Sequence, residues 1–161
     1  MSRIAKLAHL LGLVLFLGSI FTFAVASGVP ASGDLSSLAT VRRVISAGTT
    51  SLTLPGLFLL VASGAGLLRG RACLVRQAWL RAMLVAGLVI VANAVLVVVP
   101  AVRSATSLAQ EAVATGQRPA GYARAYAVES AAGAANIVLA LLAAAAGVWR
   151  FGANDAERPI G

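Results

Sequence analysis

The side chains of this chain that can do chemistry are few, and most of them lie in or beside long apolar segments. The single histidine, His9, lies in the first segment. Arg42 and Arg43 precede the second, and Glu129 opens the fourth. Ionisable side chains at membrane depth are costly unless they are paired or hydrated. Each of these residues is therefore a candidate functional residue.

A neutral imidazole at the position of His9 can bind haem iron or carry a proton. Gly12 and Phe16 share its helical face and can border a flat ligand. The structural alternative is an interfacial histidine that is hydrogen-bonded to a backbone carbonyl or to lipid headgroups. We favour the structural alternative, because histidines lie at such boundaries in many proteins.

The charged residues of the second and fourth segments suggest an ion pair. Either Arg42 or Arg43 can pair with Glu129 and so fix the second helix against the fourth. The same arginines can bind an anionic headgroup or a haem propionate. Of these roles we expect the structural ion pair.

Two asparagines complete the set of polar residues within the apolar segments. Asn93 lies in the third segment, and Asn136 lies on a small and polar face of the fourth. Helices in lipid associate through small residues and through polar side chains that bond across the interface. We expect this face to point inward, together with a stripe on the second segment made of Ser46, Thr49, Thr53, Gly56 and Ser63.

Four apolar segments, at about residues 4–27, 45–68, 82–100 and 127–149, must position these side chains. Each has close to the ~20 residues that a helix needs to cross a ~30 Å hydrocarbon core. The 161-residue chain is 60% hydrophobic and 11% charged, whereas soluble domains carry about 25% charged residues. We predict an all-α polytopic membrane protein, a four-helix transmembrane bundle that forms one integral membrane domain over residues 1–161.

The remaining segments are expected to be connectors. Residues 28–40 are small and polar, and the tail 151–161 is expected to be disordered. Ser104–Gly116 predicts an amphipathic helix on the membrane surface, ended by its glycine. Pro55 lies within the second segment and should kink it or free a backbone carbonyl. Tyr122 and Tyr126 are expected to anchor the outer membrane interface.

Charge placement predicts orientation and excludes one class of partner. The net charge is +8, but the basic residues lie singly or in small groups at segment ends, so we expect no nucleic-acid partner. Their excess beside the termini and the middle loop predicts a multi-pass membrane protein with both termini cytoplasmic. The bacterial inner membrane is the expected location, which rests on the resemblance described below. Ala24–Ala26 (AVA) also fits a signal-peptide cleavage site, but the apolar run exceeds the usual 7–15 residues, which favours retention.

The inventory of ligands argues against several functions. One cysteine, Cys73, excludes an intramolecular disulfide and a cysteine-rich metal site, and we predict no metal site. A cytochrome with two bis-histidine haems needs four histidines, and a copper transporter needs several Met, His or Cys ligands. Walker, nucleophile-elbow, HExxH and CxxC motifs do not occur. We lean away from an enzyme.

Two short segments resemble known membrane proteins. Lys6–Ser19 (KLAHLLGLVLFLGS) and Gln77–Arg81 (QAWLR) resemble the first and third helices of small bacterial four-helix membrane proteins. That group includes the HemJ-type protoporphyrinogen oxidases, the CopD-like copper-resistance domains and uncharacterised families, and an uncharacterised branch is the most similar. The HemJ resemblance implies a b-type haem on His9 and a lysine shortly after the tryptophan. Here Arg81 and Met83 occupy that region, and of these only the methionine can serve as a weak axial ligand.

Two hypotheses follow. The first is a non-catalytic membrane scaffold or partner subunit, in which the polar residues serve packing. The second is a haem b redox protein, with His9 as axial ligand and Gly12, Phe16 and Met83 around the cofactor. The lipid bilayer is the expected environment in both cases, and a homodimer or a membrane-protein partner fits either.

Overall fold

Every regular element of the described chain is a helix. The computed structural model describes residues 3–28, 34–69 and 75–149. The predicted all-α class is confirmed within these ranges. The α-helices are α1 (Arg3–Ser27), α2 (Leu35–Gly48), α3 (Leu54–Leu68), α4 (Ala78–Asn93), α5 (Val99–Thr115) and α6 (Gly121–Trp149), and two π-helical segments, η1 (Thr49–Thr53) and η3 (Ala94–Val98), join α2 to α3 and α4 to α5.

These elements form four long helices that are apolar enough to cross a membrane. They run over Arg3–Ser27, Leu35–Leu68, Ala78–Thr115 and Gly121–Trp149. The second has 34 residues and the third has 38. At a rise of 1.5 Å per residue, these lengths correspond to about 51 and 57 Å. Both exceed a ~30 Å hydrocarbon core, so part of each extends beyond it.

The extra length overturns two sequence-based expectations. The second helix begins at Leu35 rather than at residue 45, so most of the expected connector 28–40 that is described is helical. The expected surface helix at 104–116 is instead the end of the third long helix, which continues without a break from Ala78 to Thr115. Apolar segments mark only the hydrophobic part of a helix, whereas α2 and α5 bury small and polar residues against each other.

The C-terminal end of this third helix was predicted correctly. Gly116 follows Thr115 with a φ of 72°, the left-handed conformation that glycine adopts without strain. The fourth helix starts at Gly121, before the expected residue 127. The tail 151–161 lies outside the described residues.

The two π-helical segments each lie just before a proline. Pro55 follows η1, and Pro100 follows η3. A proline ring inside an α-helix clashes with the carbonyl four residues earlier and donates no hydrogen bond. The chain meets this constraint with a wider turn, in which the Leu54 amide donates to the Thr49 carbonyl and the Val99 amide to the Ala94 carbonyl. The predicted perturbation at Pro55 is therefore a π turn.

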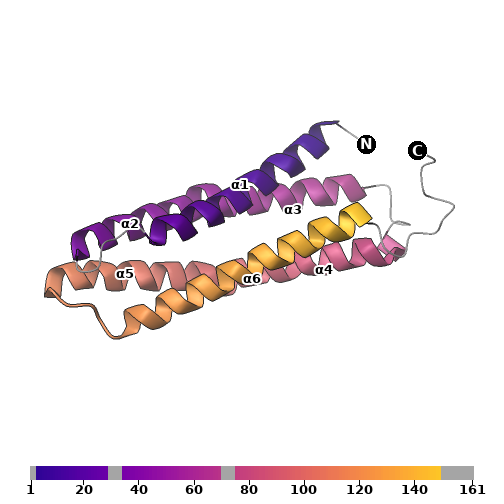
Figure 1. The fold of residues 1–161 in the computed structure, drawn as a ribbon. Helices are drawn as coiled ribbons and strands as arrows, with labels where there is room; N and C mark the ends of the chain where they lie inside the picture. The colour runs from indigo at the N-terminus through magenta and orange to yellow at the C-terminus, as the bar shows by residue number, and fades with distance from the viewer. Residues whose placement is uncertain (1–2, 29–33, 70–74, 150–161) are drawn as a thin grey trace.

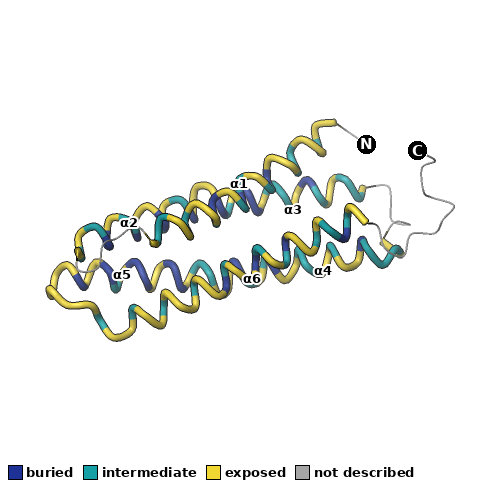
Figure 2. The backbone as a smooth tube through the Cα atoms, in the orientation of Figure 1, coloured by how far each residue is buried: buried dark blue, intermediate teal, exposed yellow. Residues whose placement is uncertain are grey.

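The helices form two layers (Figure 1). One layer contains α1, α2 and α3, and the other contains α4, α5 and α6. We call the end with Ser27, Leu35 and Gly121 the α2–α5 end, and the opposite end, with Arg3 and Trp149, the α3–α4 end. Buried residues lie mainly on the facing sides of the helices, and exposed residues lie outward (Figure 2).

Glycines set the close approach of α1 to α3. A Cβ atom added to Gly12 would lie 2.7 Å from the backbone nitrogen of Leu60. One added to Gly56 would lie 2.9 Å from the backbone nitrogen of Phe16. The two backbones are therefore in direct contact, as small residues permit in membrane helices. Phe16 is 1% exposed and joins Leu57 in a core cluster with residues of the second layer.

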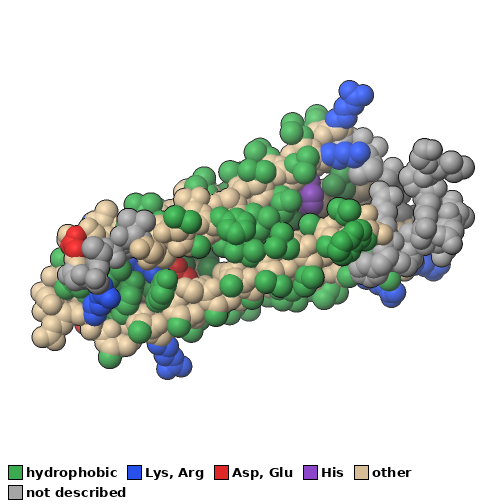
Figure 3. All heavy atoms as spheres, in the orientation of Figure 1, with side chains coloured by type: hydrophobic (Ala, Val, Ile, Leu, Met, Phe, Trp, Pro, Cys, Tyr) green, Lys and Arg blue, Asp and Glu red, His purple; other side chains and the backbone are tan. Residues whose placement is uncertain are grey.

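The two ends differ in their acidic residues, whereas the α2–α5 half also contains basic residues, namely Arg42, Arg43, Arg103, Arg118 and Arg124. Arg3, Lys6, Arg69, Arg76 and Arg81 are exposed at the α3–α4 end. The acidic residues of the described chain, Asp34, Glu111 and Glu129, all belong to the other half of the molecule. In Figure 3 the acidic side chains in view lie toward the α2–α5 end.

Candidate functional site

A buried ion pair holds the two layers together near the α2–α5 end. Arg42 lies on the inner face of α2 and is 1% exposed. Its Nη1 donates to Oε2 of Glu129 on α6 over 2.6 Å. Of the two arginines that the sequence offered, Arg42 forms the expected pair, and Arg43 is exposed. Helical geometry explains the choice, since consecutive residues on a helix point about 100° apart.

Two tyrosines enclose the arginine. Nε of Arg42 donates to the hydroxyl of Tyr122 over 3.0 Å. Its guanidinium carbon lies 5.6 Å from the ring centroid of Tyr122 and 4.9 Å from that of Tyr126. The two rings are parallel, with centroids 6.4 Å apart. An aromatic face attracts a cation, so these rings stabilise the buried charge along with Glu129.

The sequence predicts these tyrosines at the outer membrane interface, and their contact with Arg42 is an addition from the structure. A usable signal was their spacing. Tyr122, Tyr126 and Glu129 are four and three residues apart, so they share one face of a helix.

A second polar contact joins α4 to α6. Nδ2 of Asn93 donates to Oδ1 of Asn136 over 2.8 Å and to the carbonyl of Ala132 over 2.9 Å. Asn136 is 2% exposed, which confirms the expected inward face of the fourth helix. On the other layer, Ser19 and Thr53 bond through their hydroxyls over 2.8 Å.

A family model described as a predicted integral membrane protein (DUF2269) matches residues 3–150 of this chain. The chain belongs to the DUF2269 family. Searches of curated proteins and of solved structures gave no significant match. None of these comparisons shows the resemblance to HemJ-type or CopD-like proteins. Four apolar helices and the family match together make this DUF2269 protein an all-α polytopic membrane protein.

His9 of the DUF2269 protein lies at the α1–α3 contact, far along α1 from the ion pair. Its Nδ1 lies 3.1 Å from the carbonyl oxygen of Leu60 and 3.1 Å from Oγ of Ser63. Because a carbonyl only accepts, a hydrogen bond to Leu60 requires the proton on Nδ1. The structural alternative for His9 was a hydrogen bond to a backbone carbonyl, and the ring makes this contact with a carbonyl of the neighbouring helix α3.

The other residues of the expected haem site lie in helix contacts. Gly12 and Phe16 are buried against α3. Met83 lies on α4, and its thioether would be 3.3 Å from a Cβ added to Gly147 of α6. His9 and Met83 therefore belong to different layers.

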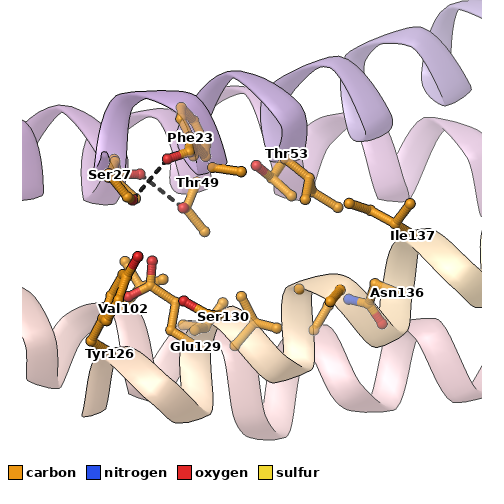
Figure 4. Close-up of a pocket in the computed structure, with 18 of the residues that line it drawn as sticks. Phe23, Ser27, Thr49, Thr53, Val102, Tyr126, Glu129, Ser130, Asn136 and Ile137 are labelled. Carbon is orange, nitrogen blue, oxygen red and sulfur yellow. Dashed lines mark hydrogen bonds between the residues drawn. The ribbon is translucent and has the colours of Figure 1, made fainter. Parts of the chain in front are cut away.

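A cavity of about 300 Å³ lies between the layers beside Glu129 (Figure 4). Thr49 and Thr53 line one wall, and Tyr126, Glu129 and Asn136 line the other. The candidate site of this DUF2269 protein is therefore the ion pair with its tyrosines and the adjoining cavity. His9 is not part of it.

Proposed function

We propose that this DUF2269 protein is a non-catalytic membrane subunit, a scaffold that presents its lipid-facing helices to a partner. The supporting observation is how its polar side chains at membrane depth are used. Arg42 bonds to α6, Asn93 bonds to α6, Ser19 bonds to η1 and His9 bonds to α3. Each bond fixes one helix against another, which is the packing role of polar residues in lipid.

The apolar outer surface supplies the area for a partner. Leu88 of α4 is 71% exposed, and Leu10 of α1 is 59% exposed. In a bilayer such side chains contact either lipid or another membrane helix. A second copy of this chain and a different membrane protein are both compatible with this surface.

Photo-crosslinking tests the scaffold. The photoreactive residue p-benzoylphenylalanine replaces Leu88 in one strain and Leu10 in another, and the protein is crosslinked in its native membrane. We expect one of the two variants to form a defined crosslinked product with a protein. The other variant, whose label lies on the opposite layer, should form none. Lipid adducts alone at both positions, in a correctly folded protein, would contradict the scaffold.

Membrane orientation belongs to the same proposal. At the α3–α4 end the described part of the chain has five exposed basic residues and no acidic one, whereas the α2–α5 end mixes four exposed arginines with acidic residues. This difference supports a cytoplasmic location for the α3–α4 end, and so for both termini, in a bacterial inner membrane. The test uses Cys73→Ser protein with either Glu111→Cys or Arg76→Cys. A membrane-impermeant maleimide should label the first variant in intact spheroplasts and the second only after permeabilisation. The reverse pattern would overturn the orientation.

One observation favours haem binding as a second candidate. Metal-binding histidines almost always donate their second ring N–H to a carbonyl, carboxylate or water. Nδ1 of His9 lies 3.1 Å from the Leu60 carbonyl, which is the arrangement of such a ligand, and in a neutral ring that donates there the Nε2 lone pair is available to a metal. Because α3 covers Gly12 and Phe16, the face that these two residues share with His9 is not open to a haem.

Optical spectra separate the two candidates. If the protein is a scaffold that binds no haem, the purified protein stays colourless after haem is added. Under the haem candidate, a Soret band appears, is lost in His9→Ala and persists in the control Ser63→Ala.

A further inference from the structure

The cavity beside Glu129 has the size and the walls of a small ligand site. Its volume of about 300 Å³ lies at the lower end of the ~300–1,000 Å³ typical of small-molecule pockets. The last two turns of α1, both π segments, the start of α5 and the first half of α6 surround it. Apolar residues dominate its lining, and the polar members are Ser27, Thr49, Thr53, Tyr126, Glu129, Ser130 and Asn136.

Both π segments border this cavity. Thr49 and Thr53 of η1 and Ala94 and Val98 of η3 line it. π turns are rare and occur frequently at functional sites. Protein interiors are otherwise close-packed, and an empty cavity costs stability in proportion to its volume. A ligand that fills the space would remove this cost.

The Glu129 carboxylate is the charged hydrogen-bonding group of the wall, beside the neutral donors of Tyr126, Ser130 and Asn136. The hydroxyl of Thr49 donates to the Ile45 carbonyl, and that of Ser27 donates to the Phe23 carbonyl, each over 2.8 Å. Their protons are therefore used within their own helices. Glu129 binds Arg42 through Oε2, and its Oε1 makes no hydrogen bond within the described chain. A ligand that complements this carboxylate oxygen must supply a hydrogen-bond donor.

Charge and access narrow the class of ligand further. Arg42 already neutralises Glu129, so the site has no net charge to attract an ammonium group. The exposed lining residues Ala24, Tyr126, Ser130 and Ala134 come from α1 and α6. The mouth of the cavity thus lies between two membrane-spanning helices, and a ligand reaches it sideways from the lipid phase.

We propose that this cavity binds a small, neutral, lipid-soluble alcohol, whose hydroxyl donates to Oε1 of Glu129 and whose apolar body lies between α1 and α6. The carboxylate acceptor and the apolar walls together carry the assignment. The site does not depend on the scaffold role, because it faces the interior of the bundle and leaves the outer faces free.

Photolabelling of the full-length protein in lipid nanodiscs tests the site. The probe is decanol with a diazirine in its chain, and the labelled residues are mapped by mass spectrometry. We expect labelling concentrated in residues 20–27 of α1 and 126–137 of α6. Even labelling of all lipid-facing helices, or none, would overturn the proposal.

A matched pair of variants ties the label to the cavity. A Cβ at Gly133 would lie 4.0 Å from Ile20, an ordinary contact, so Gly133→Leu fills the space without a backbone clash. Gly18→Leu introduces the same side chain where no atom lies within 4 Å of the added Cβ. Neither variant should lower the unfolding midpoint, and Gly133→Leu should raise it if its side chain fills the cavity. The cavity label should fall in Gly133→Leu and remain in Gly18→Leu, and equal labelling would refute the site.

Competition tests the hydroxyl. A hydrogen bond to a charged acceptor corresponds to about a tenfold or larger difference in affinity. Unlabelled decanol should therefore compete at about tenfold lower concentration than its methyl ether, which lacks the donor. Equal competition would overturn the assignment of an alcohol to Glu129.

Discussion

The α1–α3 contact and the α2–α5–α6 contact hold helices together by different means. The first brings two backbones into contact through Gly12 and Gly56. The second places a charged side chain, Arg42, in a cage made by Glu129 and two tyrosines. The glycine contact tolerates no added atom, whereas the ion-pair contact tolerates a cavity of about 300 Å³ directly beside it.

This difference follows from what each contact must satisfy. Close packing of backbones gains dispersion energy at every atom and depends on shape alone. The stability of a buried charge depends on an oppositely charged partner. Two long side chains can form such a pair while their helices stay apart. Directional bonds therefore hold the two layers at a spacing that leaves room between them, and the glycine contact leaves none.

The largest effect is expected from breaking the ion pair on one side only. Glu129→Ala leaves the Arg42 guanidinium buried without its carboxylate, which should cost about 3–5 kcal/mol of unfolding free energy. Reversible unfolding of the purified protein in mixed micelles measures this loss. The double variant Arg42→Met/Glu129→Leu removes both charges and should recover most of it. A loss below about 1 kcal/mol, the range of exposed pairs, would show that the pair is not buried.

The glycine contact should respond next, and to size rather than to charge. Gly12→Leu forces α1 away from the Leu60 backbone, and overpacking of this kind costs about 1–3 kcal/mol. Gly18→Leu on the same helix is the control, since nothing lies within 4 Å of its added Cβ. The same unfolding assay applies to both. Equal stability of the two variants would contradict the direct backbone contact.

A smaller loss is expected at the polar contact between α4 and α6. Asn93→Ala removes two hydrogen bonds to α6 and should cost about 1 kcal/mol. The double variant Asn93→Ala/Asn136→Ala should lose less unfolding free energy than the two single variants lose together, because the two amides bond to each other. Strict additivity in this double-mutant cycle would argue that the amides do not interact.

The smallest effect concerns the start of α2, outside the membrane-spanning part. Hydrogen bonds from Ser37 and Ser36 lower the pKa of Asp34 to about 2. The ionised cap therefore stabilises α2 fully above the unfolded pKa of about 3.9, and this contribution disappears as the pH falls through about 2. The pH dependence of the NMR shifts of the Ser36 and Ser37 amides, which donate to Asp34, measures this pKa. Asp34→Asn keeps a cap that does not titrate, and its amides should not follow this transition.

The sequence was sufficient for the fold class because a bilayer demands long apolar helices. It also located the inward residues Asn136 and Thr53, because small and polar residues recur on one helical face. It failed at the lengths of α2 and α5. Their buried residues include Ala105, Ala109 and Arg42, whose burial depends on the partner helix rather than on hydropathy.

The candidate site was predictable in part. The charges of Arg42 and Glu129 stand out in an apolar sequence, and their pairing follows from the cost of an isolated charge. The aromatic cage and the cavity depend on how two layers align, which no local pattern encodes. The same limit explains why Gly12 and Phe16 suggest a ligand face in the sequence but pack against α3 in the structure.

The π turns have a consequence for how this chain tolerates changes in length. A π turn holds one residue more than an α turn, and one residue corresponds to a rotation of about 100°. Deleting Leu52 would let η1 revert to an α-helix, and the two halves of the second long helix would keep nearly the same phase, because the π turn absorbs one extra residue. Ser63 would stay on the side of His9. The cost of this deletion is the restored clash between the Pro55 ring and the carbonyl four residues before it. A one-residue deletion within the regular turns of α2 or α3 has no such reserve and would rotate the remainder of the helix by about 100°, so it should be far more harmful.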